Sequence, residues 1–390
     1  MARQVADIVI VGGGVIGCAT AFFLRELGFT GRVVVFEKDS SYRFASTARS
    51  AASIRQQFTT PVSTQMSQFS WAFLAGLKER FGEEGEIALV RSAYLLLADA
   101  ARVETLRGCH ATFRQLGSDI AWLDPEDLAR RFPWLNVEDL AGATLGLAGE
   151  GWFDAYMLLR LLRVQAKRRG VEFIDEEVTG LELAPGRIEG VRLASGAAWS
   201  CGSVVNAAGP FAGRVAAMAG CELPVWPRKR TMFVIRAPLP NKGLPFVFDS
   251  SGIAIRPEGD GFICSALPDE DRDPDPGEDF EPDHYLFEEK VWPALAHRIP
   301  ALESLRLMSA WAGHYEMNLF DHNGVIGPHP EVTNFLFANG FSGHGVMHSP
   351  ATGRGVAELL LHGRYVSLDL SPLGYERIAA ERPIREALVY

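Results

Sequence analysis

The chain has 390 residues and a formal net charge of −10 at pH 7, with 47% hydrophobic and 22% charged residues. A chain of this length usually exceeds one core, so we expect two domains or one discontinuous pair. The acidic balance, without a long lysine or arginine run, argues against nucleic acid or an anionic membrane as the main partner. No apolar run approaches the ~20 residues that a membrane span needs.

The first predicted element is a buried strand at residues 8–11, followed by a glycine-rich turn and a helix over residues 18–27. Gly12, Gly14 and Gly17 match the pattern G-x-G-x-x-G around Val15 and Ile16. The three glycines allow the tight turn, the approach of a pyrophosphate and the packing of helix on strand. Because the helix N-terminus also attracts phosphate, the stretch predicts a dinucleotide site.

A second apolar strand at residues 32–36 ends in Glu37, about 20 residues after Gly17, and Lys38 follows. A carboxylate there accepts hydrogen bonds from both ribose hydroxyls and repels a 2′-phosphate. The sequence therefore predicts FAD or NAD(H), and it argues against NADP(H). The first strand begins at residue 7, which leaves no room for a targeting peptide, so we expect a cytoplasmic protein.

Small hydroxyl residues come next, at a predicted helix start. Ser46, Thr47 and Ser50, with Arg49, suit a second phosphate or the flavin edge, although an ordinary serine-rich loop is the alternative. Residues 61–80 follow as an amphipathic core helix. Residues 85–145 look inserted, and Asp154 is expected to cap a helix over 155–169.

Residues 225–314 are predominantly β in pattern, and they include an expected strand at 304–312 and a helix at 285–298. The acidic, proline-rich segment 268–279 is predicted to be a floppy, solvated loop without a chemical role. A second strand–turn–helix then spans residues 335–362 and contains Gly340-Phe-Ser-Gly-His-Gly345. Two nucleotide-type turns need two ligands or one extended ligand, and a single FAD satisfies both.

The cysteines and histidines suggest neither a disulfide framework nor a metal. The five cysteines are scattered without C-x-x-C spacing, and the nine histidines form no H-E-x-x-H motif. We therefore expect reduced thiols and no metal site.

The chain resembles the glycine oxidase, sarcosine oxidase and D-amino-acid oxidase class of flavoproteins over nearly its whole length. The resemblance rests on residues 9–17, 36–38, 46–52, 204–210 and 340–345. Within the class, residues 53–58 and 340–345 are most similar to the mitochondrial FAD-dependent oxidoreductase domain-containing proteins and their bacterial relatives. Residues 46–52 are also similar to D-amino-acid dehydrogenases.

The resemblance implies a Rossmann-type FAD-binding domain combined with a discontinuous β-sheet substrate domain, as in the glutathione-reductase-like flavoproteins. The first domain would comprise residues 1–85, 145–224 and 315–390, and the second residues 86–144 and 225–314. FAD would lie extended, with further contacts at Val178, Ala208, Gly209, Gly343, His344, Gly345, Val346 and Met347. A helix N-terminus at the flavin stabilises the charge that reduction leaves there.

Substrates of this class are mostly amines that carry a carboxylate, for which arginine is the natural partner. Arg55 matches the carboxylate-binding arginine of sarcosine oxidase, and Tyr315 matches an active-site tyrosine. The alternatives are a solvent-facing ion pair and a packed tyrosine, respectively. His344 is expected over the flavin edge or as a shaping residue of the turn, and Arg256 is a further carboxylate candidate.

Departures from the sarcosine oxidase pattern qualify the expected chemistry. Gly313 stands where those enzymes tether the flavin through cysteine, so FAD should be non-covalent. Met347 and the stretch Ile263-Cys264 stand where they carry lysines. Because a cation near the flavin assists oxygen reduction, a dehydrogenase with an unknown electron acceptor is favoured.

The expected function is oxidation of the C–N bond of an amino acid or N-substituted amino acid by hydride transfer to the flavin. The alternatives are an oxidase that releases hydrogen peroxide, a 2-hydroxy-acid dehydrogenase, and a flavin-bearing assembly protein with little turnover.

Overall fold

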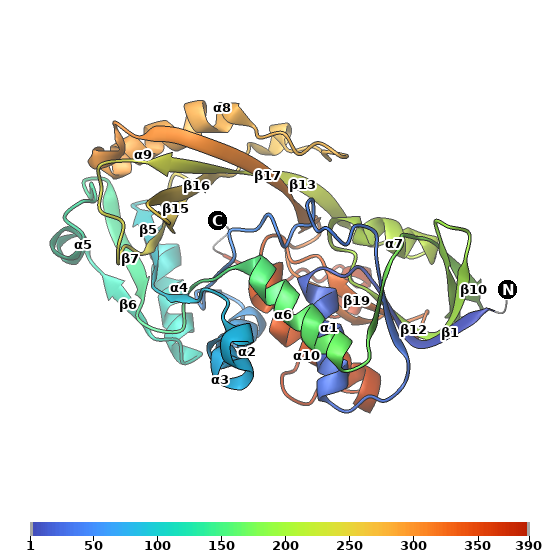
Figure 1. Ribbon diagram of the computed structural model, residues 1–390. Coiled ribbons are helices and arrows are strands. Elements are labelled where there is room, and N and C mark those ends of the chain that lie inside the picture. Colours follow the sequence, from blue (N-terminus) through green and yellow to red (C-terminus); the bar gives the residue numbers. More distant parts are fainter. Residues whose placement is uncertain (1–2, 388–390) are drawn as a thin grey trace.

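Two eight-stranded sheets, with helices packed around them, organise the chain (Figure 1). The computed structural model describes residues 3–387. The first sheet contains β1 (Gln4–Val11), β2 (Val33–Glu37), β9 (Glu172–Asp175), β10 (Val178–Ala184), β11 (Arg187–Leu193), β12 (Ala198–Asn206), β18 (Val325–Pro328) and β19 (Phe335–Asn339).

The centre of this first sheet is parallel and buried on both faces. β1 lies between β2 and β12 and is parallel to both, while β9 and β19 continue the parallel order on either side. Ile8 and Ile10 belong to the core cluster that contains the helices α1 (Val15–Glu26), α6 (Ala155–Arg168) and α10 (Gly345–His362). Val9 and Val11 belong to the opposite cluster with α7 (Ala212–Met218). Burial on both faces explains the continuous apolar run of β1.

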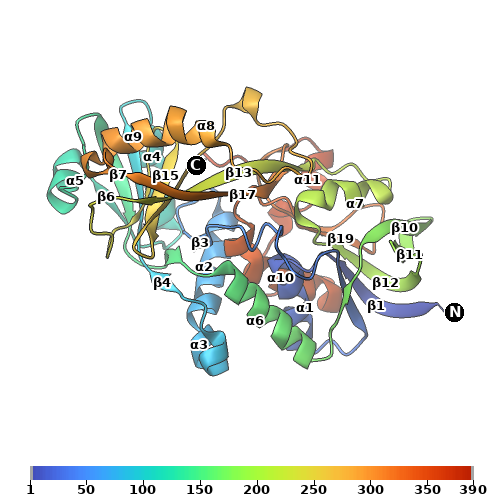
Figure 2. The same ribbon diagram turned by 45° about the horizontal axis from the view of Figure 1, so that its top comes forward.

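The second sheet is mostly antiparallel and follows the order β17-β13-β16-β15-β14-β5-β7-β6. Its strands are β5 (Tyr94–Asp99), β6 (Ile120–Leu123), β7 (Leu140–Gly146), β13 (Val225–Arg236), β14 (Phe246–Phe248), β15 (Ile253–Glu258), β16 (Gly261–Ala266) and β17 (Arg306–Asn318). β13 and β17 extend from this sheet toward α7 (Figure 2). They pair from Val225–Asn318 at one end to Arg236–Arg306 at the other.

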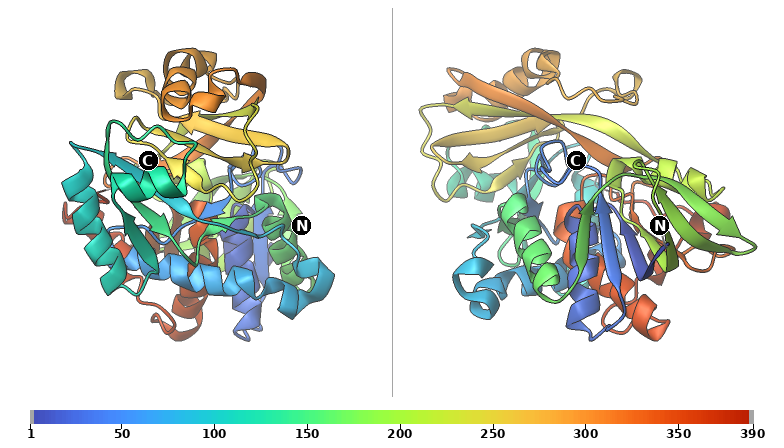
Figure 3. Two further views of the ribbon diagram at one scale, coloured as in Figure 1. Left: turned by 90° about the vertical axis from the view of Figure 1, so that its left-hand side faces the viewer. Right: turned by 45° about the vertical axis from the view of Figure 1, so that its right-hand side comes forward.

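The remaining elements connect and cover the two sheets, as two further views show (Figure 3). The third sheet, ordered β3-β8-β4, consists of β3 (Ser53–Ile54), β8 (Gly151–Trp152) and β4 (Val90–Arg91). The other helices are α2 (Pro61–Ala75), α3 (Leu77–Phe81), α4 (Val103–Gln115), α5 (Pro125–Arg131), α8 (His284–Leu286), α9 (Trp292–Arg298) and α11 (Glu376–Ala379). No helix within residues 3–387 is long and apolar enough to cross a membrane.

Several predicted elements are confirmed, and others differ in detail. The Asp154 side chain accepts a 2.8 Å bond from the N–H of Met157 and so caps α6. The predicted helix 285–298 contains a π-turn, Phe287–Val291, just before Trp292 and Pro293. Proline has no N–H to donate, which favours an irregular turn there. The expected helix 61–80 is divided into α2 and α3, which meet at Gly76.

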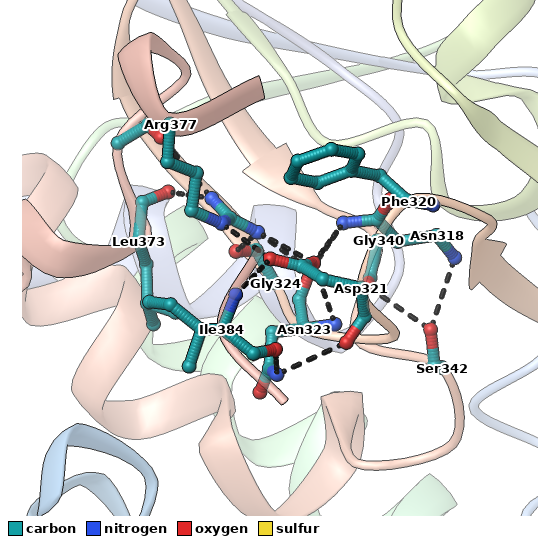
Figure 4. A network of polar contacts seen from close by, with 11 residues as sticks. Asn318, Phe320, Asp321, Asn323, Gly324, Gly340, Ser342, Leu373, Arg377 and Ile384 are labelled. Atoms are coloured by element: carbon teal, nitrogen blue, oxygen red, sulfur yellow. Dashed lines mark hydrogen bonds and ion pairs between the residues drawn. The ribbon is translucent and has the colours of Figure 1, made fainter. Parts of the chain in front are cut away.

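A buried polar network fixes the chain where β17 ends (Figure 4). The Asp321 carboxylate binds the Arg377 guanidinium, with the Nε–Oδ2 contact at 2.8 Å. Asn318 Nδ2 donates to Asp321 Oδ1 at 2.9 Å, and the N–H of Asn318 donates to the hydroxyl of Ser342 at 3.0 Å. The network therefore joins α11 and the end of β17 to the turn that precedes α10.

Candidate active site

The two predicted nucleotide-type turns open on the same cavity, which has a volume of about 1000 Å³. Almost all predicted site residues line it: Gly12, Gly14, Val15, Ile16, Glu37, Lys38, Ser46, Thr47, Arg49, Ser50, Arg55, Val178, Ala208, Gly209, Tyr315, Gly343, His344, Gly345, Val346 and Met347. Gly17 and Arg256 are not among the lining residues. The structure thus brings together residues from the start, the middle and the end of the chain.

The first glycine turn shows a different steric requirement at each glycine. Gly12 has a φ of +99°, and a Cβ there would lie 2.4 Å from the carbonyl oxygen of Ala207. A Cβ on Gly17 would lie 2.0 Å from the carbonyl oxygen of Gly12. Near Gly14 the closest atom to an added Cβ is Thr47 Oγ1, at 3.6 Å. Gly12 and Gly17 therefore allow the backbone to pack, while Gly14 leaves room on the cavity side for a ligand.

Glu37 is held at the end of β2 by backbone N–H groups. Gly13 donates to Oε2 at 2.7 Å, and Asp39 donates to Oε1 at 3.0 Å. Burial raises the pKa of the Glu37 carboxyl, and these two hydrogen bonds act against that rise. The carboxylate therefore faces the cavity in a fixed orientation, as binding of ribose hydroxyls requires.

The segment that contains Ser46 and Arg49 connects the first turn to β17. Thr47 Oγ1 accepts a 3.2 Å bond from the N–H of Val15, while the hydroxyl of Ser46 donates to the carbonyl oxygen of His314 at 2.6 Å. Arg49 Nη1 donates to the carbonyl oxygen of Ala312, also at 2.6 Å. The hydroxyl groups thus position the segment in addition to lining the cavity.

The second turn packs closely against Tyr315. Gly343 has a φ of +102°, and a Cβ there would lie 2.5 Å from Tyr315 Cε2. Gly345 begins α10, so the N-termini of α1 and α10 both reach the cavity. The two helices also pack together, since a Cβ on Gly353 would lie 2.5 Å from the backbone of Ala19.

Arg55 and His344 form the polar centre of the cavity wall beyond these turns. Arg55 is 3% exposed, and its Nη2 lies 3.3 Å from His344 Nε2. Burial, together with the charge of Arg55, lowers the pKa of His344 well below its usual value. Because arginine only donates, the neutral imidazole accepts at Nε2. The Phe58 ring lies 4.6 Å from the Arg55 guanidinium carbon and packs edge-on to His344.

Beside this pair lies Glu150, a buried carboxyl that the sequence analysis missed. The N–H groups of Gln56 and Tyr94 donate to it at 2.9 and 3.0 Å. Burial raises the pKa of Glu150 to about 7, while these hydrogen bonds and the charge of Arg55 act in the opposite direction. A Cβ on Gly146 would lie 1.8 Å from its Oε2. In the sequence, Glu150 is marked only by its position between Gly149 and Gly151. That pattern does not predict that its side chain is buried.

Arg256 lies outside the cavity and has structural partners. Its Nη2 donates to the carbonyl oxygen of Ala51 at 2.7 Å, and its Nη1 donates to the carbonyl oxygen of Pro257 at 2.8 Å and pairs with Glu258. These contacts connect β15 to the segment before β3. A carboxylate role for Arg256 therefore has no support from this geometry.

The acidic segment departs from its prediction, because residues 277–281 line the cavity. The ring of Phe280 stacks on His314 with centroids 3.9 Å apart. Lys229 pairs with Asp279 at 2.6 Å and with Asp283 at 2.9 Å. Residues 268–279 are all exposed or half-buried, which agrees with a solvated segment. The prediction of a floppy loop is wrong at its end, because Lys229 on β13 binds Asp279 and the adjoining Phe280 stacks on His314.

The cavity has the features that FAD needs. Its wall combines two helix N-termini, a glycine turn that leaves room for phosphates, and a carboxylate at the ribose position. Within residues 3–387, no group of three or more histidine, cysteine or acidic side chains could hold a metal ion.

Comparison with known proteins agrees with this geometry. The sequence profile of the family described as "FAD dependent oxidoreductase" (DAO) matches residues 7–359. The chain belongs to the DAO family of FAD-dependent oxidoreductases. FAD is therefore its cofactor, and the fold inferred from the resemblance is confirmed.

Relatives of this DAO-family protein include both curated sequences and solved structures. The FAD-dependent oxidoreductase domain-containing protein 1 of Bos taurus is 40% identical, over 95% of this chain and 84% of that protein. Glycine oxidase of Geobacillus kaustophilus is 29% identical, over 95% of this chain and 97% of the enzyme. The crystal structure of L-proline dehydrogenase from P. horikoshii has a TM-score of 0.86 and 27% identity, over 98% of this chain and 100% of that one.

Proposed function

We propose that this FAD-dependent oxidoreductase dehydrogenates an amino acid or an N-substituted amino acid whose carboxylate binds to Arg55. The observation that carries the proposal is the buried guanidinium of Arg55 in the cavity wall, 3.3 Å from a neutral His344. A planar guanidinium binds a carboxylate through two parallel hydrogen bonds. Because Arg55 lines the cavity, the carboxylate of a bound substrate is a natural acceptor for its guanidinium.

His344 and Phe58 orient Arg55 in this proposal. The imidazole accepts one N–H, and the ring of Phe58 packs against the guanidinium. Orientation matters because a substrate fixed at its carboxylate presents the neighbouring carbon at one place in the cavity. Tyr94, Phe246 and Phe248 also line the cavity and would enclose the apolar part of the substrate.

The amine class agrees with the relatives. Their printed names include glycine oxidase, sarcosine dehydrogenase and L-proline dehydrogenase, and each named compound carries an amine and a carboxylate. Bound FAD supplies the acceptor for the hydride of the carbon next to nitrogen. Tyr315 and Met347 would border the reacting carbon, and a neutral amine needs no dedicated base.

Two features of the wall favour a dehydrogenase with non-covalent FAD. Among the described residues, Lys38 is the only lysine that lines the cavity, and its Nζ lies over the ring of Phe211, 3.6 Å from the centroid. No cysteine of residues 3–387 lines the cavity, and Gly313 occupies the position next to Arg49. In the part of the chain that the structure describes, this wall thus holds no lysine other than Lys38 that could assist oxygen reduction, and no thiol that could tether the flavin.

The test is anaerobic titration of the purified yellow protein with sarcosine, dimethylglycine, L-proline and D-amino acids, one at a time. We expect the oxidised flavin band to bleach with one of them and to return only slowly when air is admitted. Rapid return with peroxide release would assign an oxidase. A band that no amine bleaches would contradict the proposal and favour the hydroxy-acid or assembly alternative.

A further inference from the structure

Glu316 lies in the cavity wall between the segment after β12, which contains Gly209, and the turn of residues 340–345 before α10. It belongs to β17, is 9% exposed and lines the cavity. Its Oε2 accepts a 3.1 Å hydrogen bond from the N–H of Gly340. A Cβ on Gly345 would lie 2.9 Å from Oε1, and a Cβ on Gly209 would lie 4.0 Å from Oε2. The carboxyl group therefore reaches both the first residue of α10 and the segment that follows β12.

Among the described residues, no basic side chain forms an ion pair with this carboxyl. Burial raises the pKa of Glu316 to about 7, and only the backbone N–H groups of Gly340 and Phe341 act against that rise. Glu316 and Glu37 lie at different ends of the cavity: Glu37 accepts from the N–H of Gly13 at the first glycine turn, and Glu316 accepts from the N–H of Gly340 before α10. A carboxyl with this pKa changes its charge near neutral pH, beside the helix N-terminus that is expected to face the flavin.

The elements packed around Glu316 carry several charged or titratable groups, but none of them is among the causes that shift its pKa. Burial lowers the pKa of His314 and of His344, which are both neutral near pH 7. Lys229 is paired with two aspartates. The titratable or charged groups on these elements are Arg306, His314 and Tyr315 on β17, Arg228, Lys229, Arg230 and Arg236 on β13, Arg214 on α7, and His344, His348, Arg354, Glu358 and His362 at α10.

We propose that Glu316 takes up a proton from solvent when FAD is reduced and releases it when FAD is reoxidised. Two electrons and one proton leave one negative charge on the reduced flavin, and the electrons come from the C–H bond of the donor or from an added reductant. That charge disfavours a second negative charge nearby, so the Glu316 carboxylate becomes a carboxylic acid. The proposal does not depend on the substrate, because any two-electron reductant produces the same charge.

The readout is the midpoint potential of the flavin as a function of pH, measured on the holoprotein by spectroelectrochemical titration. Each proton taken up with two electrons changes the equilibrium tenfold per pH unit, which is about 30 mV. Above pH 7 we expect the wild-type slope to be about twice that of Glu316→Gln. Glutamine keeps an oxygen for the N–H of Gly340 but cannot take up the proton. Equal slopes would overturn the proposal.

Glu150→Gln is the matched control. Glu150 is also buried, and its pKa is likewise raised to about 7, but it is not among the residues that line the cavity. We expect it to keep the wild-type slope. A slope that falls equally in both variants would show a general effect of buried acids and would overturn the assignment to Glu316.

A second measurement needs no variant. The infrared difference spectrum between reduced and oxidised wild-type protein should contain a protonated carboxyl band that shifts when glutamate is labelled with carbon-13. If reduction at pH 8 produces no such band, the proposal is wrong even if Glu316→Gln fails to bind FAD.

Discussion

At the scale of single residues, Arg55 is expected to bind the carboxylate of the substrate. Charge-assisted hydrogen bonds to a carboxylate contribute about 1.5–3 kcal/mol each. We therefore predict that Arg55→Ala raises the substrate concentration for half-maximal bleaching by about 10–100-fold, while FAD content stays near the wild-type level. Titrating each purified variant anaerobically measures this. Arg256→Ala is the control, since Arg256 binds the backbone of Ala51 outside the cavity. It should lose stability and keep the wild-type half-saturation.

Lysine at position 55 tests the geometry separately from the charge. A lysine ammonium is a point charge without the planar fork of arginine. We predict that Arg55→Lys recovers part of the affinity lost in Arg55→Ala but leaves bleaching slow, because the substrate is held less firmly. Stopped-flow bleaching rates at saturating substrate check this. A wild-type rate in Arg55→Lys would contradict the positioning role of the guanidinium.

At the scale of elements, the contact between α1 and α10 sets the spacing of the two N-termini at the cavity. A Cβ on Gly353 would lie 2.5 Å from the Ala19 backbone, which cannot retreat easily. We predict that Gly353→Ala destabilises the protein by about 1–3 kcal/mol and weakens FAD binding. Urea unfolding and FAD titration of the apoprotein measure the two effects.

The control at this scale is Gly108→Ala on α4, where nothing lies within 4 Å of an added Cβ. This change should raise stability by about 0.5–1 kcal/mol and leave FAD affinity unchanged. If Gly353→Ala behaves in the same way as Gly108→Ala, the two helices do not constrain the cavity.

The sequence predicted these elements well where one local rule decides the structure. The glycine turn after β1, Glu37 at the end of β2 and the Asp154 cap each depend on residues close in sequence. The sequence did not predict the partners of Arg256, the buried acids Glu150 and Glu316, or the packing of Phe280 on His314. Those features depend on strands that meet only in the folded sheets. The acidic charge of residues 268–279 predicted a solvated loop, and it did not predict the ion pairs of Lys229 with Asp279 and Asp283.

At the scale of the whole molecule, buried histidines and buried glutamates change the free energy of unfolding with pH in opposite directions. The folded-state pKa of His348 falls to about 3 and that of His344 falls as well, so the unfolded chain binds more protons below pH 6.5. The pKa of Glu150 and that of Glu316 rise to about 7, so the folded chain binds more protons between pH 4.5 and 7. These two contributions oppose each other between pH 4.5 and 6.5.

We therefore predict that these groups leave the free energy of unfolding nearly flat between pH 4.5 and 6.5. Below pH 4.5 it should fall, because the histidines and carboxyls with a lowered pKa, such as Asp139 and Glu172, take up protons more readily in the unfolded chain. Urea titrations across this range test the prediction. Glu150→Gln removes one of the two contributions that fall with pH, so its free energy of unfolding should rise between pH 4.5 and 6.5 instead of staying flat. A wild-type pH profile in that variant would contradict the raised pKa of Glu150.

The central claim is that a carboxylate-bearing amine reduces the flavin while bound to Arg55. The most direct measurement compares anaerobic bleaching by the amino acid that proves active with bleaching by the same compound converted to its primary amide. The amine and the C–H bond are the same in both, and only the anionic group is removed. We predict bleaching by the acid and, at equal concentration, little or none by the amide. Equal bleaching by both would contradict the carboxylate site at Arg55.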